Sequence, residues 1–181
     1  MSRNPAIVTA IIVCVLTMST VSAMAQSPAE EGGWVITPMV GLALDEDADP
    51  SLTIAGALAH RVARGIVVEG ELGHVFDMAP DDADVDSSLT TVHGSVLYFF
   101  DLGYTLTPYA AGGMGIAKFS HQVAMPPDSI DRTEIGFNIG GGVTIPLNDR
   151  TSARGDVRFM RHIDDVPSVW RFGAAITIRL P

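Results

Sequence analysis

Apolar and polar residues alternate with a period of two along most of this sequence, from Trp34 to Leu180. Such alternation is typical of β-strands with one apolar face, because successive side chains of a strand point to opposite sides. Turn residues close each run, and no run shows the period of an amphipathic helix. The sequence therefore predicts eight strands, at 34–44, 52–61, 66–76, 89–100, 106–119, 133–146, 151–162 and 168–180.

The segment 168–180 shows the two faces most clearly. One face carries Trp170, Phe172, Ala174, Ile176, Ile178 and Leu180, and the other carries Arg171, Gly173, Ala175, Thr177 and Arg179. The second face mixes long charged side chains with small ones, which suits a narrow lumen. A water-facing exterior would more plausibly carry lysine, yet Lys118 is the only lysine of the chain. We therefore predict that the apolar face points outward into lipid, the reverse of a soluble lipocalin-like barrel.

Segment lengths and connections agree with a membrane barrel. A tilted strand needs roughly 9–11 residues to cross a bilayer, and in lipid only helices and closed barrels satisfy every backbone polar group. Long connections at 45–51, 77–87, 120–132 and 162–168 alternate with short ones around 63–65, 101–103 and 148–150. Long outer loops and short periplasmic turns alternate in this way in transmembrane barrels. The predicted fold is all-β: an eight-stranded antiparallel up-and-down transmembrane β-barrel with both termini in the periplasm.

Aromatic residues fall near both predicted rims, as girdles at membrane interfaces do. Toward the short turns these are Trp34, Tyr98, Phe100, Tyr104 and Tyr109, and toward the long loops they are Phe76, Phe119, Phe159, Trp170 and Phe172.

The first 25 residues predict export. Arg3 precedes an uncharged apolar run at 6–16, and Ala23-Met24-Ala25 has the small-x-small pattern of a signal-peptidase site. The apolar run is too short to span about 30 Å of hydrocarbon as a helix. We predict a cleaved signal peptide at 1–25 and one outer-membrane β-barrel domain at 26–181. Cys14 is the only cysteine, so the mature chain is expected to hold no disulfide and no thiolate metal site.

The chain is acidic, with a formal net charge of −10. Nucleic acid is therefore not expected as a partner, because that binding relies on basic patches. The predicted outer loops hold thirteen acidic residues: Asp45, Glu46, Asp47, Asp49, Asp77, Asp81, Asp82, Asp84, Asp86, Asp128, Asp131, Asp164 and Asp165. The spacing of Asp82, Asp84 and Asp86 resembles the start of a Ca²⁺ loop, but Ser87 and His93 stand where such a loop has Gly and Glu. A solvated acidic surface is the favoured interpretation.

Eight charged residues share the predicted lumen face: Glu69, Glu71, Glu134, Asp156, Arg154, Arg158, Arg171 and Arg179. Eight strands leave an interior only wide enough for side chains to fill, and buried charges require partners. We expect these residues to interlock as a network that closes the lumen. The alternative is a narrow passive channel for small solutes or ions.

Two cationic residues near the outer rim occupy alternating strand positions that are predicted to face the lipid. Lys118 and Arg161 are expected there either to contact lipopolysaccharide phosphates or to snorkel without a specific ligand. An enzyme is not predicted. A hydrolase needs a nucleophile, a base and an orienting acid within reach, and among the five histidines only His93 shares a strand face with a serine, Ser95. No cofactor or catalytic metal is expected.

Three Gly-rich or alternating motifs carry a family resemblance: Thr107-Pro-Tyr-Ala-Ala-Gly-Gly-Met-Gly-Ile-Ala117, Gly136-Phe-Asn-Ile-Gly-Gly-Gly-Val-Thr144 and the closing strand from Trp170. With these motifs the chain resembles the small outer-membrane β-barrel proteins, which include the barrel of outer membrane protein A and outer membrane protein X. The motifs are loose and specify barrel geometry rather than activity. The resemblance implies a structural or interaction barrel in a bacterial outer membrane. It would contact membrane lipid and lipopolysaccharide and present its acidic loops to an extracellular partner. The barrel-assembly machinery that inserts such barrels usually reads a terminal aromatic residue, whereas this chain ends Arg179-Leu180-Pro181.

Overall fold

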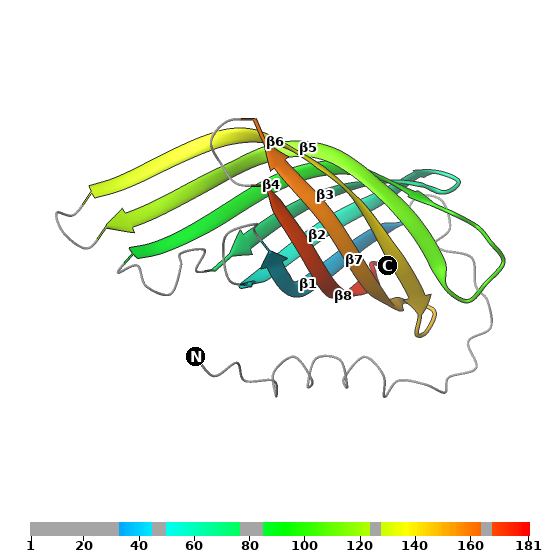
Figure 1. The fold of residues 1–181 in the computed structure, drawn as a ribbon. Coiled ribbons are helices and arrows are strands. Elements are labelled where there is room, and N and C mark those ends of the chain that lie inside the picture. The colour runs from blue at the N-terminus through cyan, green and yellow to red at the C-terminus, as the bar shows by residue number, and fades with distance from the viewer. Residues whose placement is uncertain (1–32, 45–49, 77–84, 124–127, 164–167) are drawn as a thin grey trace.

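The computed structural model is a closed barrel in which each strand pairs with its neighbours in sequence and β1 pairs with β8 (Figure 1). The structure describes residues 33–44, 50–76, 85–123, 128–163 and 168–181. The strands are β1 (Trp34–Leu44), β2 (Ser51–Ala63), β3 (Ile66–Val75), β4 (Val85–Phe99), β5 (Thr107–Val123), β6 (Asp128–Pro146), β7 (Thr151–His162) and β8 (Val169–Arg179). The predicted eight-stranded antiparallel fold is confirmed.

No helix within the described ranges is both long and apolar enough to cross a membrane.

The outer surface of the barrel is apolar and its interior is charged. On β8, Trp170 is 48% exposed whereas the next residue, Arg171, is 1% exposed. On β3, Val68 and Leu72 face outward while Glu69 and Glu71 are buried. This arrangement matches the facing predicted from the alternation, and it places the large apolar side chains where lipid can cover them.

The two ends of the barrel differ. At one end, which we call the turn end, short connections join β2 to β3, β4 to β5 and β6 to β7. The tightest of these uses Gly65, whose φ of 75° is a conformation that residues with a side chain rarely adopt. The first and last strands also meet there, where Leu180 N donates to Trp34 O. The opposite end, the loop end, corresponds to the extracellular side in barrels of this kind.

Three strands extend further at the loop end than the alternation predicted. β4 begins at Val85 rather than 89, β5 ends at Val123 rather than 119, and β6 begins at Asp128 rather than 133. The pairing register is continuous there, with Val85 opposite Val123 and Val123 opposite Asp128. In Figure 1 these three strands project beyond the others. Backbone pairing needs no apolar face once the strands leave the lipid, so polar residues continue the ladder.

The longer strands correct part of the acidic-loop prediction. Asp86 lies on β4, and Asp128 and Asp131 lie on β6, rather than in loops. The ten other acidic residues assigned to the outer loops, including Asp82 and Asp84 of the Ca²⁺-like spacing, lie outside the described residues.

Most of the predicted girdle aromatics are exposed on the outer surface. Trp34, Tyr98, Phe100 and Tyr104 lie toward the turn end, and Phe76, Trp170 and Phe172 toward the loop end. Phe159 is half-buried beside Trp170, with ring centroids 5.0 Å apart. Two assignments were wrong, because Tyr109 and Phe119 lie on the inward face of β5. Tyr109 is 4% exposed, and Phe119 packs against an interior cluster.

The interior is layered along the barrel axis. Toward the loop end an apolar cluster consists of Ala43, Val75, Leu89, Ala117 and Val169. Toward the turn end a second cluster consists of Ala59, Val67, Leu97, Tyr109 and Ala111. The buried charges lie between these two clusters.

Candidate functional site

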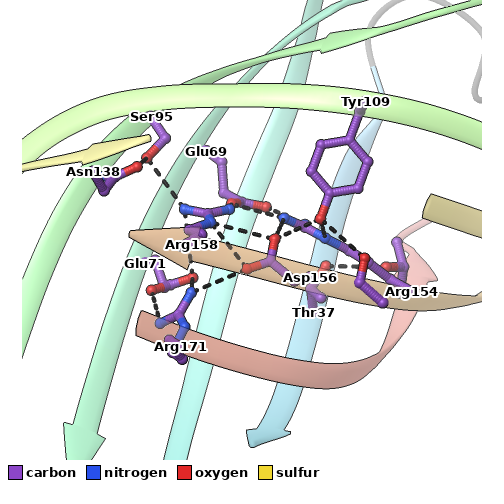
Figure 2. A network of polar contacts seen from close by, with 12 residues as sticks. Thr37, Glu69, Glu71, Ser95, Tyr109, Asn138, Arg154, Asp156, Arg158 and Arg171 are labelled. Carbon is purple, nitrogen blue, oxygen red and sulfur yellow. Dashed lines mark hydrogen bonds and ion pairs between the residues drawn. The ribbon is translucent and has the colours of Figure 1, made fainter. Parts of the chain in front are cut away.

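Six charged side chains meet in the middle of the lumen and form what we call the lumen network (Figure 2). Its members are Glu69 and Glu71 from β3, Arg154, Asp156 and Arg158 from β7, and Arg171 from β8, none more than 6% exposed. Residues two apart on a strand share a face, so β3 and β7 each present successive charges inward. Because β3 and β7 are four strands apart in the ring of eight, their contacts cross the lumen.

Arg158 occupies the centre of the lumen network. Its Nη2 donates to Glu69 Oε1 at 2.6 Å, and its Nε donates to Asp156 Oδ1 at 3.1 Å. Its Nη1 donates to Ser95 Oγ at 3.3 Å and lies 3.8 Å from Glu71 Oε2. This guanidinium therefore connects β7 with β3 and β4.

The other two arginines each join a glutamate to Asp156. Arg154 binds Glu69 through Nη1 at 2.5 Å and Asp156 Oδ2 through Nη2 at 3.0 Å. Arg171 binds both oxygens of Glu71, at 2.5 and 2.9 Å, and reaches Asp156 Oδ1 at 3.4 Å. Three guanidinium groups and three carboxylates thus compensate one another, and each arginine contacts at least two acids.

Tyr109 belongs to this site although the sequence interpretation placed it in a girdle. Its hydroxyl donates to Asp156 Oδ2 at 2.5 Å and accepts from Arg154 Nε at 2.7 Å. Gly142 is the register partner of both Tyr109 and Asp156, and a Cβ built there would lie 2.5 Å from the tyrosine oxygen. The glycine therefore provides the space through which the tyrosine reaches across. The sequence carried one indication of this inward position, because Tyr109 shares its strand face with the small residue Ala111.

A short polar extension leads from the lumen network to β6. Ser95 Oγ donates to Asn138 Oδ1 at 3.1 Å, and both side chains are 3% exposed. His93 is also buried on the same face of β4, as the sequence predicted. The serine hydroxyl is engaged by Asn138 and Arg158, and not by the histidine.

Two residues predicted for the network lie elsewhere in the interior. Glu134 is half-buried on β6 toward the loop end, and its Oε2 has no hydrogen-bond partner. Arg179 is half-buried at the turn end and lines a cavity there. Across the part of the chain that the structure describes, no ion pair joins either side chain to the six.

The two outward cations lie on the lipid-facing surface but not next to each other. Lys118 pairs in register with Thr133 and Arg161 with Phe137, so the two positions are four residues apart along β6. Both side chains are exposed. Over the described residues, no group of three or more His, Cys, Asp or Glu side chains is arranged to hold a metal ion.

Comparison with known proteins agrees with this architecture. A family model described as outer membrane protein beta-barrel domain matches residues 11–176. No curated protein matches the sequence. Neisserial surface protein A superimposes with a TM-score of 0.66 at 12% identity, covering 85% of this chain and 100% of its own. OprG from Pseudomonas aeruginosa gives 0.61 at 11% identity, with 86% and 99% covered. The attachment invasion locus protein Ail of Yersinia pestis gives 0.57 at 13% identity, with 83% and 100% covered.

Proposed function

Because this chain belongs to the outer membrane protein β-barrel family and resides in the outer membrane, we propose that it is a non-catalytic barrel with a plugged lumen that holds its outer segments at the cell surface. In this function the barrel is a scaffold, and recognition takes place at the loop end. The lumen network is the observation that carries the proposal.

The lumen network is suited to close the interior. It spans the barrel from β3 to β7, and its charges are compensated by direct contacts between 2.5 and 3.8 Å. An apolar cluster borders it on the loop side, and on the turn side a second apolar cluster forms one wall of the lumen. An ion crossing the lumen would have to displace these buried contacts, each of which replaces hydration that the charged groups lost on folding.

The partner at the loop end is proposed from the composition of the outer segments. Residues 45–49 carry four acids and no base, so the segment favours a cationic or neutral partner over a polyanion. Ail of Yersinia pestis has been solved in complex with the heparin analogue sucrose octasulfate. By charge, such a ligand would be repelled by this chain.

We further propose that Lys118 and Arg161 contact lipopolysaccharide phosphates, because both are exposed cations on the outer surface of β5 and β7. Insertion of the chain would use the barrel-assembly machinery, as the resemblance to small outer-membrane barrels implies.

Single-channel recording of the purified protein tests the plug. In planar bilayers that accept a control porin, the parent protein should insert without discrete conductance steps. Recordings of Asp156→Asn provide the matched test, since this change removes a lumen charge at nearly constant volume. Reproducible steps from the parent, with an ion selectivity that Asp156→Asn alters, would establish the channel alternative instead.

A further inference from the structure

A cavity of about 120 Å³ lies at the turn end of the lumen, and we call it the mouth cavity. Its lining differs from one side to the other. Strands β1 to β4 provide a mostly apolar wall of Val35, Ala59, Val67, Leu97 and Phe99, together with Thr37 and Arg61. Strands β6 to β8 provide a polar wall that includes Thr144, Ser152, Thr177 and Arg179. Glu69 and Arg154 of the lumen network form the inner limit of the cavity.

The mouth cavity is cationic within an acidic protein. Its lining includes four arginines, Arg61, Arg150, Arg154 and Arg179, against two acids, Glu69 and Asp149, so its formal charge is 4 − 2 = +2. The whole chain carries −10. Arg154 is occupied by Glu69 and Asp156. The excess positive charge of the cavity therefore lies nearer its opening.

Arg179 is the cation best placed to bind a ligand in the mouth cavity. It is half-buried, and its guanidinium forms no ion pair with any carboxylate of the described segments. A partly buried cation gains free energy when an anionic oxygen reaches it.

We propose that the mouth cavity binds a small amphipathic anion, specifically a free monocarboxylate with a short hydrocarbon body. The carboxylate would lie at Arg179, and the hydrocarbon would lie against Val67 and Leu97. A water molecule needs about 10–15 Å³ of cavity volume, so the 120 Å³ of the mouth cavity admits roughly eight to twelve waters, or a ligand of about eight or more non-hydrogen atoms. Hexanoate has this size. The site goes beyond the scaffold function, and it does not depend on whether the lumen conducts.

Methyl NMR of the folded protein in lipid nanodiscs tests the proposal at the site itself. Titration with hexanoate should shift the methyl signals of Val67 and Leu97 saturably. Hexylamine has the same hydrocarbon chain as hexanoate but the opposite charge, and phosphate is an anion without a hydrocarbon chain. Neither should produce saturable shifts at these methyl groups. Dodecanoate, which models a membrane fatty acid, is too long for the cavity and should bind at least ten-fold more weakly than hexanoate.

Two matched variants identify the anchoring cation. Arg179→Gln should weaken hexanoate binding at least ten-fold. Arg64→Gln should leave binding unchanged, because Arg64 is an exposed turn-end arginine that pairs with Asp101 and does not line the cavity. If Arg179→Gln fails to fold, the ligand series on the parent protein decides alone. Absence of saturable shifts with hexanoate, equal shifts with hexylamine, or unchanged binding in a folded Arg179→Gln variant would overturn the proposal. A failure here leaves the conductance result untouched, so the two proposals are tested separately.

Discussion

Removal of Arg158 is the most direct perturbation of the lumen network. The side chain is 1% exposed and contacts Glu69, Asp156 and Ser95. In Arg158→Ala the network changes from three cations against three anions to two against three. Breaking a buried ion pair costs about 3–5 kcal/mol of unfolding free energy, since the remaining charge stays buried. Glu69 and Asp156 both keep contacts with Arg154. We therefore expect a loss at the lower end, about 3 kcal/mol.

Arg171 provides an internal comparison, because its removal leaves an acidic side chain with fewer remaining contacts than the removal of Arg158 does. Glu71 depends on the two bonds from Arg171, and its remaining contact is Arg158 at 3.8 Å. Arg171→Ala should therefore destabilise the barrel more than Arg158→Ala, by about 5 kcal/mol. The exposed pair of Arg64 and Asp101, at 3.4 Å, is the control. Arg64→Ala should cost less than about 1 kcal/mol.

Equilibrium urea unfolding in lipid vesicles, followed by tryptophan fluorescence and by the gel mobility of the folded form, measures these differences. A double-mutant cycle between Arg171 and Glu71 should give a coupling free energy of about 1–3 kcal/mol, because the double variant leaves neither charge unpaired. The reasoning fails if Arg158→Ala costs no more than Arg64→Ala and the cycle is additive. That result would mean that water screens the lumen charges.

Three further outcomes follow from the fold. Cell fractionation should recover the mature chain, cleaved after Ala25, in outer membranes with heat-modifiable mobility, and recovery in the soluble periplasm would contradict the membrane assignment. Ile139→Arg, at a lipid-facing side chain that is 66% exposed, should cost about 2–4 kcal/mol in vesicle unfolding, whereas lumen-side Thr177→Ser should cost far less. Gly142→Ala should cost about 1–3 kcal/mol, because the new Cβ would lie 2.0 Å from the backbone oxygen of Gly155 and 2.5 Å from the buried tyrosine oxygen of the site. Gly155→Ala, whose Cβ would have only an ordinary contact at 3.8 Å, is its control, and equal losses would argue against the steric explanation.

The strand count and the two faces of each strand could be predicted because both depend on local parity. Every second residue of a strand shares a face, so a few clear positions determine the facing of the other residues of the same strand. The inward face was identified by its mixture of long charged and small side chains. The ends of β4, β5 and β6 could not be predicted in the same way. Outside the lipid neither face must be apolar, so the periodic signal ends near residues 119 and 133 while the pairing continues to Val123 and Asp128.

The alternation also indicated which charged residues face the lumen, but it gave no information on their position along the barrel axis. Arg179 follows Ala175, the register partner of Arg154, by four residues on β8, and Glu134 precedes Gly140, the register partner of Arg158, by six residues on β6. At about 3.3 Å per residue, these offsets amount to roughly 13 and 20 Å along the strand. Both side chains therefore lie outside the lumen network although they face inward. Heights follow from strand pairing, which the sequence pattern alone does not determine.

The charged lumen also has a consequence for how the barrel specifies its own fold. Replacing a buried ion-pair network by apolar residues of similar volume is often neutral or stabilising, so stability alone does not account for six buried charges. In a membrane barrel the outward face must be apolar, and an apolar lumen would make both faces of every strand alike. A one-residue slip in register would then carry little penalty. With Glu69, Glu71 and Arg158 on the inward face, the same slip would place charges in the hydrocarbon. The six charges of the lumen network therefore favour the observed facing of β3, β7 and β8, the strands that carry them.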